Sequence, residues 1–150
     1  MTLEEFRRPR MLIQKPETPV SEAARAMESN QVGMVVVQER GRVLGVVTDR
    51  DLALRVVGRK LDTEATLLGH VMTPDPACLP ISLDKTAALD LMRTRKIRRV
   101  ILMDDEHVAG MVTIDDLLLP PDRDSNAIAD VICAQLAEPA QVQPAHATQP

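Results

Sequence analysis

Apolar and polar positions follow one another in the same order twice along this chain of 150 residues. In the first half, a short extended piece at Leu12–Ile13 precedes a helix whose apolar positions recur every three or four residues. These positions are Val20, Ala23, Ala24 and Met27. Two apolar strands are predicted next, over 32–37 and 42–47, joined by a tight turn. A second helix is predicted to begin after Thr48 and to end near Gly58, because glycine commonly ends helices.

The second half predicts the same order of elements. An extended piece over 77–79 precedes a helix with Leu83, Ala87 and Leu91 on its apolar face and, shifted round it, Ala88 and Met92. Strands are predicted over 99–103 and 108–113, and a second helix after Thr113. Each half is therefore a strand, helix, strand, strand, helix unit. One such unit leaves a sheet face poorly covered, so we expect the two units to pack together.

A direct sequence repeat underlies this order. GVVTDRDL at 45–52 aligns with GMVTIDDL at 110–117 at an offset of 65 residues, without a gap. Across residues 9–52, ten of 44 aligned positions are identical. The pairs are Pro9/Pro74, Ala23/Ala88, Met27/Met92, Val35/Val100, Val43/Val108, Gly45/Gly110, Val47/Val112, Thr48/Thr113, Asp51/Asp116 and Leu52/Leu117. We call 45–52 the first motif and 110–117 the second motif.

The repeat divides the chain into six segments. We predict an N-terminal extension (1–6), repeat 1 (7–58), a connector (59–71), repeat 2 (72–119), a helical region (120–137) and a tail (138–150). The pattern breaks at Pro120 and Pro121, and an amphipathic helix is predicted from Ser125 to Leu136. The tail is mostly Ala, Gln and Pro, a composition typical of disorder.

Composition limits the functions that the chain can have. Apolar residues make up 45% of it, yet Phe6 is its one aromatic residue, so the core must consist of aliphatic side chains, Met and Ala. Base stacking on aromatic rings is excluded as a mode of nucleic-acid binding. The formal charge is -4, so no overall basic field attracts nucleic acid or anionic lipid.

Candidate catalytic and metal-binding sets are also missing from the sequence. His70, His107 and His146 share no metal-ligand spacing, and no nucleophile and base occur in a recognisable motif. We therefore expect no enzymatic activity, no bound metal and no required cofactor.

The subcellular location is predicted from cysteine usage and from the N-terminus. Cys78 and Cys133 form no CxxC motif and are interpreted as reduced thiols. The N-terminal MTLEEFRRPR carries charges where a signal peptide needs an apolar segment, and no apolar run approaches the length of a membrane span. These features predict a cytoplasmic protein without a membrane partner.

Thr48 and Asp51 in the first motif have two interpretations. A threonine followed three residues later by an acid, before an apolar residue, is the capping box that starts a helix. Alternatively, a carboxylate can accept hydrogen bonds from both hydroxyls of a cis-diol, and a threonine beside a helix start is well placed near an anion. The residues alone leave both readings open, since one hydroxyl can cap a helix and also contact a ligand.

The doubled motif resembles that of the cystathionine beta-synthase (CBS) domain family. Each copy closes with Gly, two apolar residues, Thr, two variable residues, Asp and Leu. VMTPDP at 71–76 is similar to the entry of such repeats, and KIRRVILMDD at 96–105 to their central strand. The resemblance spans about residues 7–119. It implies an α/β (α+β) fold in which two repeats pack about a pseudo-twofold axis and form two clefts.

The resemblance also implies ligands and site residues. CBS clefts commonly hold AMP, ADP, ATP or S-adenosylmethionine, with the motif aspartate on the ribose and the threonine near ribose or phosphate. These roles would fall to Thr48 and Asp51 in one cleft, and to Thr113 and Asp116 in the other.

Basic residues at 93–99, RTRKIRR, add a difference between the clefts. In the family, basic residues at the start of the central strand often reach ligand phosphates across the repeats. This cross-repeat arrangement implies that Arg98 and Arg99 serve the cleft of Asp51. Their counterparts in repeat 1, Gly33 and Met34, are uncharged, so the two clefts are expected to be unequal. The alternative is a solvated basic face. RRPR at 7–10 replaces the MTPD of repeat 2 and is expected to change the rim of the first cleft.

By resemblance, the chain is expected to be a non-catalytic regulatory module for energy sensing. It would bind an adenine nucleotide or S-adenosylmethionine and signal occupancy to an unidentified partner protein, as a homodimer. The alternative is a ligand-independent dimerisation or scaffold protein of the same fold.

Overall fold

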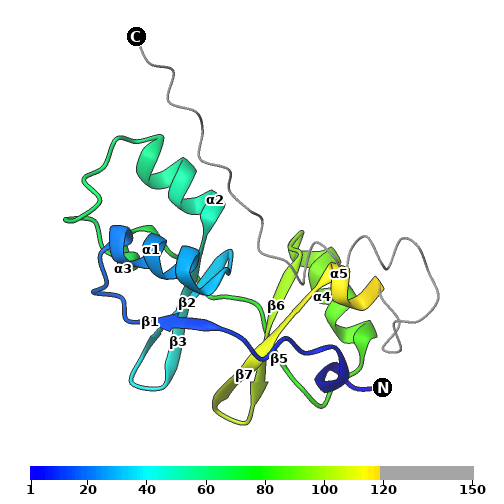
Figure 1. Ribbon diagram of the computed structural model, residues 1–150. Helices are drawn as coiled ribbons and strands as arrows, with labels where there is room; N and C mark the ends of the chain where they lie inside the picture. The colour runs from blue at the N-terminus through cyan, green and yellow to red at the C-terminus, as the bar shows by residue number, and fades with distance from the viewer. Residues whose placement is uncertain (119–150) are drawn as a thin grey trace. The chain divides into compact units, whose positions relative to one another are not determined.

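A computed structural model, which describes residues 1–118 of the chain, contains two strand-and-helix units, one for each repeat (Figure 1). The predicted helix at 125–136, the tail and Cys133 lie outside the described residues. The observed order of elements confirms the predicted strand, helix, strand, strand, helix unit in both repeats, with boundaries that differ by one or two residues.

Repeat 1 builds a four-stranded sheet in the order β1-β2-β3-β4. Strand β1 is parallel to β2, and the other pairs are antiparallel. The elements are β1 (Leu12–Gln14), α1 (Val20–Asn30), β2 (Met34–Glu39), β3 (Arg42–Thr48), α2 (Asp49–Leu52), the π-helical turn η2 (Ala53–Val57), α3 (Leu68–Val71) and β4 (Thr73–Pro74). The helix predicted after Thr48 is therefore α2 continued by η2.

Repeat 2 builds a three-stranded sheet in the order β5-β6-β7. Its elements are β5 (Cys78–Pro80), α4 (Lys85–Arg95), β6 (Arg99–Asp104), β7 (His107–Thr113) and α5 (Ile114–Leu118), and a 3-10 helix, η1 (Leu3–Phe6), lies at the start of the chain. The hairpins carry the same register shift, after Val37 in repeat 1 and after Leu102 in repeat 2. These two positions are 65 residues apart, the offset of the sequence repeat, so the two hairpins share the same local irregularity.

The central strands are buried on both faces. In β2, Val35 and Val37 pack with α1 in the core of repeat 1, whereas Met34 and Val36 join Ile101 of β6 in a third cluster shared by the two repeats. This explains the unbroken apolar run in β2, since a strand covered on both faces does not alternate. Pairing of the two sheets through this cluster satisfies the expectation that neither unit closes its core alone.

The structure adds detail to two sequence-based assignments and corrects a third. The connector is not only a link, because α3 places Leu68 and Val71 in the core of repeat 1. The N-terminal extension likewise places Leu3 and Phe6 in the core of repeat 2. Leu83 was expected on the buried face of α4 but is 38% exposed, because it precedes the N-cap residue Asp84 and the core face is formed by Ala88 and Met92.

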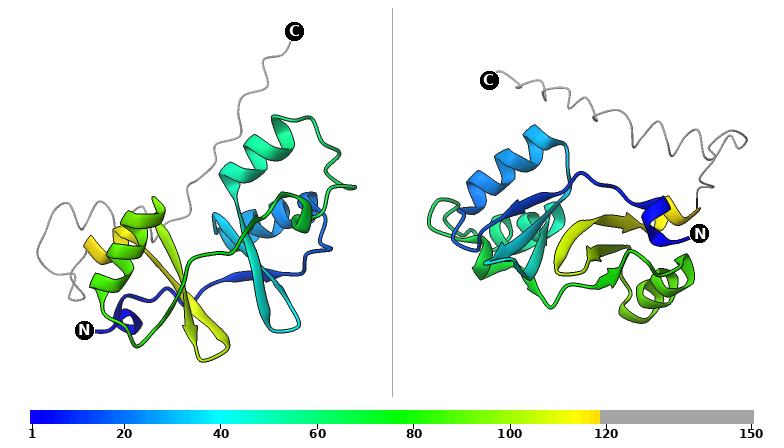
Figure 2. Two further views of the ribbon diagram at one scale, coloured as in Figure 1. Left: turned by 180° about the vertical axis from the view of Figure 1, so that it is seen from behind. Right: turned by 90° about the horizontal axis from the view of Figure 1, so that it is seen from below.

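The two repeats exchange their edge segments. Thr73, which precedes β5 at the start of repeat 2, pairs with Val46 in β3 of repeat 1. Arg8, which precedes β1 at the start of repeat 1, pairs with Met111 in β7 of repeat 2, through two backbone hydrogen bonds of 2.8 and 3.1 Å. Both pairs are related by the 65-residue offset. In Figures 1 and 2 the N-terminal segment accordingly runs along repeat 2 before it enters repeat 1 as β1.

Each exchanged segment crosses directly over the glycine of a motif. A Cβ atom built on Gly45 would lie 2.6 Å from the carbonyl oxygen of Thr73, and one on Gly110 would lie 2.5 Å from that of Arg8. No side chain fits at such distances, because both obstacles are backbone atoms of a paired segment. The glycine of the motif is therefore required by the crossing of the chain.

Replacing either glycine by alanine is expected to destabilise the protein by about 1–3 kcal/mol, the usual cost of overpacking. Gly33→Ala is the control, because the nearest atoms that its Cβ would meet belong to the side chains of Asp49 and Arg99. Urea unfolding monitored by circular dichroism measures the three variants. Equal stability of Gly45→Ala and the unchanged chain would contradict the close approach.

Candidate functional site

The first motif forms the predicted capping box. The Thr48 Oγ1 accepts a hydrogen bond of 3.2 Å from the Asp51 backbone N–H, and the Asp51 carboxylate accepts one of 2.9 Å from the Thr48 N–H. The first backbone N–H of the helix, that of Asp49, donates to the carbonyl of Gly33 at 3.1 Å. Strand β2 and the motif helix are thereby joined at the strand entry. Aspartate is long enough for the return bond, although glutamate or glutamine is more usual.

The second motif forms the same cap with additional partners. The Asp116 carboxylate accepts from the Thr113 N–H at 2.8 Å, and the Thr113 Oγ1 accepts from the Asp116 N–H at 3.3 Å. The Thr113 hydroxyl also donates to Asp116 at 2.8 Å, a contact that the structure gives only for the second motif within residues 1–118. Thr113 is buried, whereas Thr48 is half-buried.

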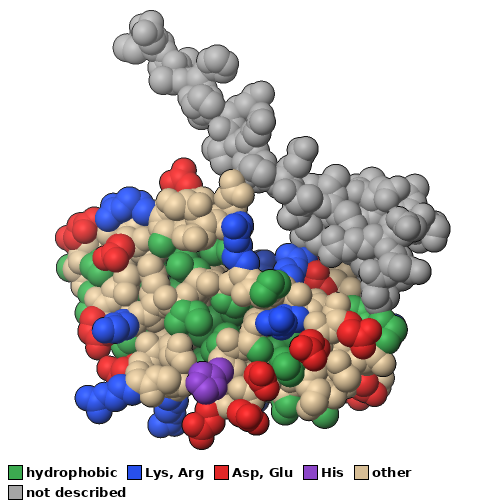
Figure 3. Space-filling view, turned by 60° about the horizontal axis from the view of Figure 1, so that its bottom comes forward, with side chains coloured by type: hydrophobic (Ala, Val, Ile, Leu, Met, Phe, Trp, Pro, Cys, Tyr) green, Lys and Arg blue, Asp and Glu red, His purple; other side chains and the backbone are tan. Residues whose placement is uncertain are grey.

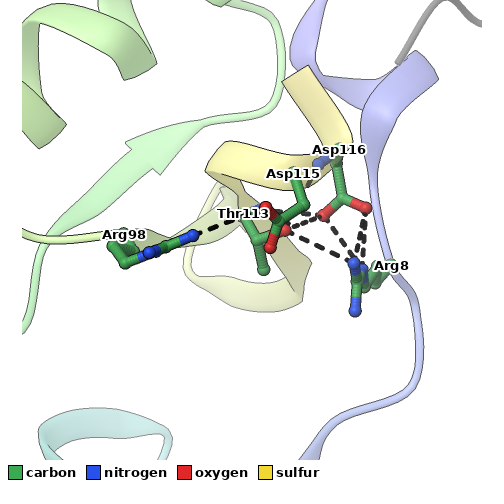
Figure 4. A network of polar contacts seen from close by, with 5 residues as sticks. All are labelled: Arg8, Arg98, Thr113, Asp115 and Asp116. Atoms are coloured by element: carbon green, nitrogen blue, oxygen red, sulfur yellow. Dashed lines mark hydrogen bonds and ion pairs between the residues drawn. The ribbon is translucent and has the colours of Figure 1, made fainter. Parts of the chain in front are cut away.

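Arg8 reaches the second motif from the exchanged N-terminal segment (Figure 4). Its Nε lies 2.8 and 2.9 Å from the two Asp116 carboxylate oxygens, and its Nη2 lies 2.8 Å from Oδ1. The Nη2 also donates to the Thr113 Oγ1 at 3.4 Å. The sequence associates RRPR with the rim of the first cleft, but its Arg8 contacts the second motif. The strand exchange places this segment against the second motif, across 108 residues of sequence.

The first motif has a different and looser cationic partner. The Arg55 Nη2 lies 3.3 Å from one Asp51 oxygen, four residues along the same helical segment. The Arg55 Nη1 donates to the carbonyl of Val71 at 2.6 Å and to the Thr73 Oγ1 at 3.0 Å. Sequence reasoning overlooked both Arg55 and the contact of Arg8. Asp51 and Arg55 are four residues apart, the usual spacing of an ion pair on a helix, so the sequence alone could have predicted this contact.

Arg98 and Arg99 point in different directions. Arg98 contacts Asp115 of its own repeat at 3.5 Å, with 77% of its side chain exposed (Figure 4). Its backbone carbonyl accepts from the Ile114 N–H, which keeps it beside the second motif. Arg99, the first residue of β6, alternates to the other side, and its Nη2 lies 3.7 Å from a Cβ built on Gly33. Of the two, Arg99 is thus the one placed beside repeat 1.

A cavity of about 480 Å³ contains no residue of either motif in its lining. It is lined by Arg42, Val43, Leu44, Asp75, Pro76, Cys78 and Arg95. Burial raises the pKa of the Cys78 thiol, and the neighbouring Asp75 raises it further, while Arg95 acts in the opposite direction. Cys78 therefore stays protonated at neutral pH and is a weak nucleophile.

The described residues offer neither a metal site nor a membrane-spanning helix. No group of three or more His, Cys, Asp or Glu side chains within residues 1–118 has an arrangement that could hold a metal ion. In the same part of the chain, no helix has both the length and the apolar character that crossing a bilayer requires.

In the space-filling view, apolar side chains gather in the middle of one face with charges of both signs around them (Figure 3).

Comparison with known proteins assigns the family. The CBS domain model matches the chain twice, over residues 15–58 and 68–119. The chain therefore belongs to the CBS domain family and carries a tandem pair of these domains. The predicted family and the mixed α/β fold of two tandem repeats are both confirmed.

The relatives differ greatly in length. The chain is 32% identical over 102 residues to the CBS domain-containing protein YhcV of Bacillus subtilis, covering 68% of this chain and 72% of YhcV. It is 33% identical over 95 residues to CBSCBSPB3 of Arabidopsis thaliana, covering 63% of this chain but only 17% of that protein. A crystal structure of an uncharacterized conserved protein from Pyrococcus horikoshii has a TM-score of 0.70 and 26% identity, covering 78% and 89% of the two chains.

Loss of the capping hydroxyl is expected to cost more in the second motif than in the first. Thr48→Ala removes one acceptor and should destabilise by about 1 kcal/mol. Thr113→Ala also removes the bonds to the Asp116 carboxylate and Arg8, so about 2 kcal/mol is expected. The serine variants, which keep the hydroxyl, are the matched controls. Thermal and urea unfolding give the comparison, and a larger loss for Thr48→Ala would contradict the assigned networks.

Proposed function

We propose that the chain is a regulatory module that binds an adenosine-containing ligand at the first motif, with Thr48 and Asp51 on the ribose. One observation carries this proposal. The Asp51 side chain is 17% exposed, and one of its two carboxylate oxygens lies 3.3 Å from the Arg55 guanidinium. The Thr48 hydroxyl accepts a hydrogen bond from the Asp51 N–H but has no acceptor for its own hydrogen among residues 1–118. A carboxylate acceptor and a hydroxyl donor side by side suit a vicinal diol.

Arg99 supports a phosphorylated ligand. It lies at Gly33, whose carbonyl accepts from the first N–H of the motif helix. A guanidinium there is well suited to an anionic group, because its planar donors bind phosphate oxygens in pairs. AMP, ADP, ATP and S-adenosylmethionine are the candidates, and a preference for the nucleotides follows from this charge. Arg98 stays a prediction as a phosphate contact, since its present partner is Asp115.

Signalling to a partner is supported by the helix that carries the first motif. Leu54 and Val57, one and two turns beyond Asp51, are 58% and 72% exposed. A ligand that breaks the ion pair between Asp51 and Arg55 would alter the hydrogen bonds of Arg55 to Val71 and Thr73. Ligand binding would then change the position of the exposed Leu54 and Val57, an apolar surface suited to a second copy or to another protein. We propose a homodimer and a regulated partner on this basis, in a non-catalytic cytoplasmic protein that senses nucleotide levels.

The alternative of a ligand-independent scaffold is favoured by the closed capping boxes, in which each threonine and aspartate already has hydrogen-bond partners without a ligand. The two functions make different predictions for a variant that keeps the cap and removes the charge.

Asp51→Asn is such a variant, because the amide oxygen can still accept from the Thr48 N–H. Hydrogen bonds to a charged group contribute about 1.5–3 kcal/mol, so nucleotide affinity should fall roughly tenfold to a hundredfold. Asp90→Asn is the control, because Asp90 is also paired with an arginine but lies on α4. Thermal melts with AMP, ADP, ATP and S-adenosylmethionine at millimolar concentration provide the measurement. No shift with any of them would refute the proposed ligand class.

The two neighbouring arginines allow a second comparison. Arg99→Gln should weaken ATP binding about tenfold and leave adenosine binding less affected, because the lost contact is to phosphate. Arg98→Gln should cause the smaller loss, because its guanidinium is exposed and turned to Asp115. Isothermal titration of both variants with ATP and adenosine compares them. A larger loss for Arg98→Gln would overturn the placement of Arg99 at the ligand.

A further inference from the structure

The second motif already holds a side chain of the chain itself. The Arg8 guanidinium contacts both Asp116 oxygens and the Thr113 hydroxyl, and the Asp116 side chain is 9% exposed (Figure 4). We infer that Arg8 closes the second motif, so that the chain binds one adenosine-containing ligand, at the first motif, and not two. This inference rests on the function proposed above.

The atoms that a ribose would need in the second motif are engaged. A vicinal diol would donate to the two Asp116 oxygens, and these accept from Arg8 at 2.8 and 2.9 Å. The Thr113 hydroxyl, the neighbouring donor, gives its hydrogen to Asp116 at 2.8 Å. A ligand would have to replace a charge-assisted pair by bonds between a carboxylate and neutral hydroxyls, which are weaker.

One sequence difference separates the two motifs. The residue equivalent to Arg8 is Thr73, which crosses the first motif at the same backbone position. Thr73 is uncharged, and its hydroxyl accepts from Arg55. Among residues 1–118, the cationic partner of Asp51 is consequently Arg55 alone, at 3.3 Å and from its own helical segment. The exchange that builds the fold thus delivers a cation to one motif and a threonine to the other.

Arg8 is held in place on both sides. The Leu3 N–H donates to the carbonyl of Leu83 at 2.7 Å, and Leu3 and Phe6 are buried in the core of repeat 2. The backbone of Arg8 is paired with Met111, and the chain then continues into β1. Withdrawing the guanidinium therefore works against an anchored backbone. The anchored backbone keeps the guanidinium within reach of Asp116, where it competes with a ligand.

Binding stoichiometry in the full chain tests the inference. The unchanged protein and its variants are titrated with AMP, ADP, ATP and S-adenosylmethionine by calorimetry, and the complexes are counted by native mass spectrometry. Arg8→Thr copies the residue of the first motif and should raise the count from one ligand per chain to two. Arg8→Thr combined with Asp51→Asn, or with Asp116→Asn, should return it to one. Arg10→Thr, at an exposed arginine two residues away, should leave one ligand bound.

Arg8→Gln gives the same test with a side chain of similar length, and melting curves establish that each variant is folded. Two ligands on the unchanged chain, or one on both folded Arg8 variants, would overturn the inference while the proposed function stands. Binding by an Arg8 variant alone would support the inference and refute the first motif as the natural site. No binding to any of these proteins would refute both.

Discussion

Each repeat is crossed by the segment that leads into β1 or β5 of the other repeat, and the rest of the structure depends on this constraint. Thr73 and Arg8 pair with the last strands of the opposite repeats, over glycines that leave no room for a Cβ atom. This pairing completes each sheet and fixes the registers on either side of the shared apolar cluster. It also brings residues from the start of the chain to the threonine and aspartate of the second motif.

A symmetric backbone therefore supports two unequal sites. Both motifs form the same capping box, with the same donors and acceptors at distances within about 0.1 Å of each other. The difference comes from the side chain that the exchanged segment carries to the motif. At the second motif, Arg8 contacts both carboxylate oxygens of Asp116. At the first motif, the equivalent residue Thr73 is uncharged and accepts a hydrogen bond from Arg55. Under the proposed function, a single residue in these segments would set the number of usable sites.

Capping and ligand binding by the motif are compatible because they use different lone pairs and hydrogens. One Asp51 oxygen satisfies a backbone donor at the helix start, and the carboxylate keeps further acceptor positions. The cap also gives a reason for the motif to persist at a site that binds nothing. A tandem CBS protein can therefore retain both motifs while one of them serves only the fold.

The sequence by itself determined the repeated unit, the family and the capping role of Thr48 and Asp51, because these depend on local spacing and on similarity between the halves. Periodicity also located most of the core, but not Leu3, Phe6 or Leu68, whose segments are too short for a pattern. The tertiary structure alone decided that Arg8 meets Asp116 and that Arg98 and Arg99 diverge. Such contacts depend on which segment crosses which strand, and no local spacing encodes a pairing across 108 residues.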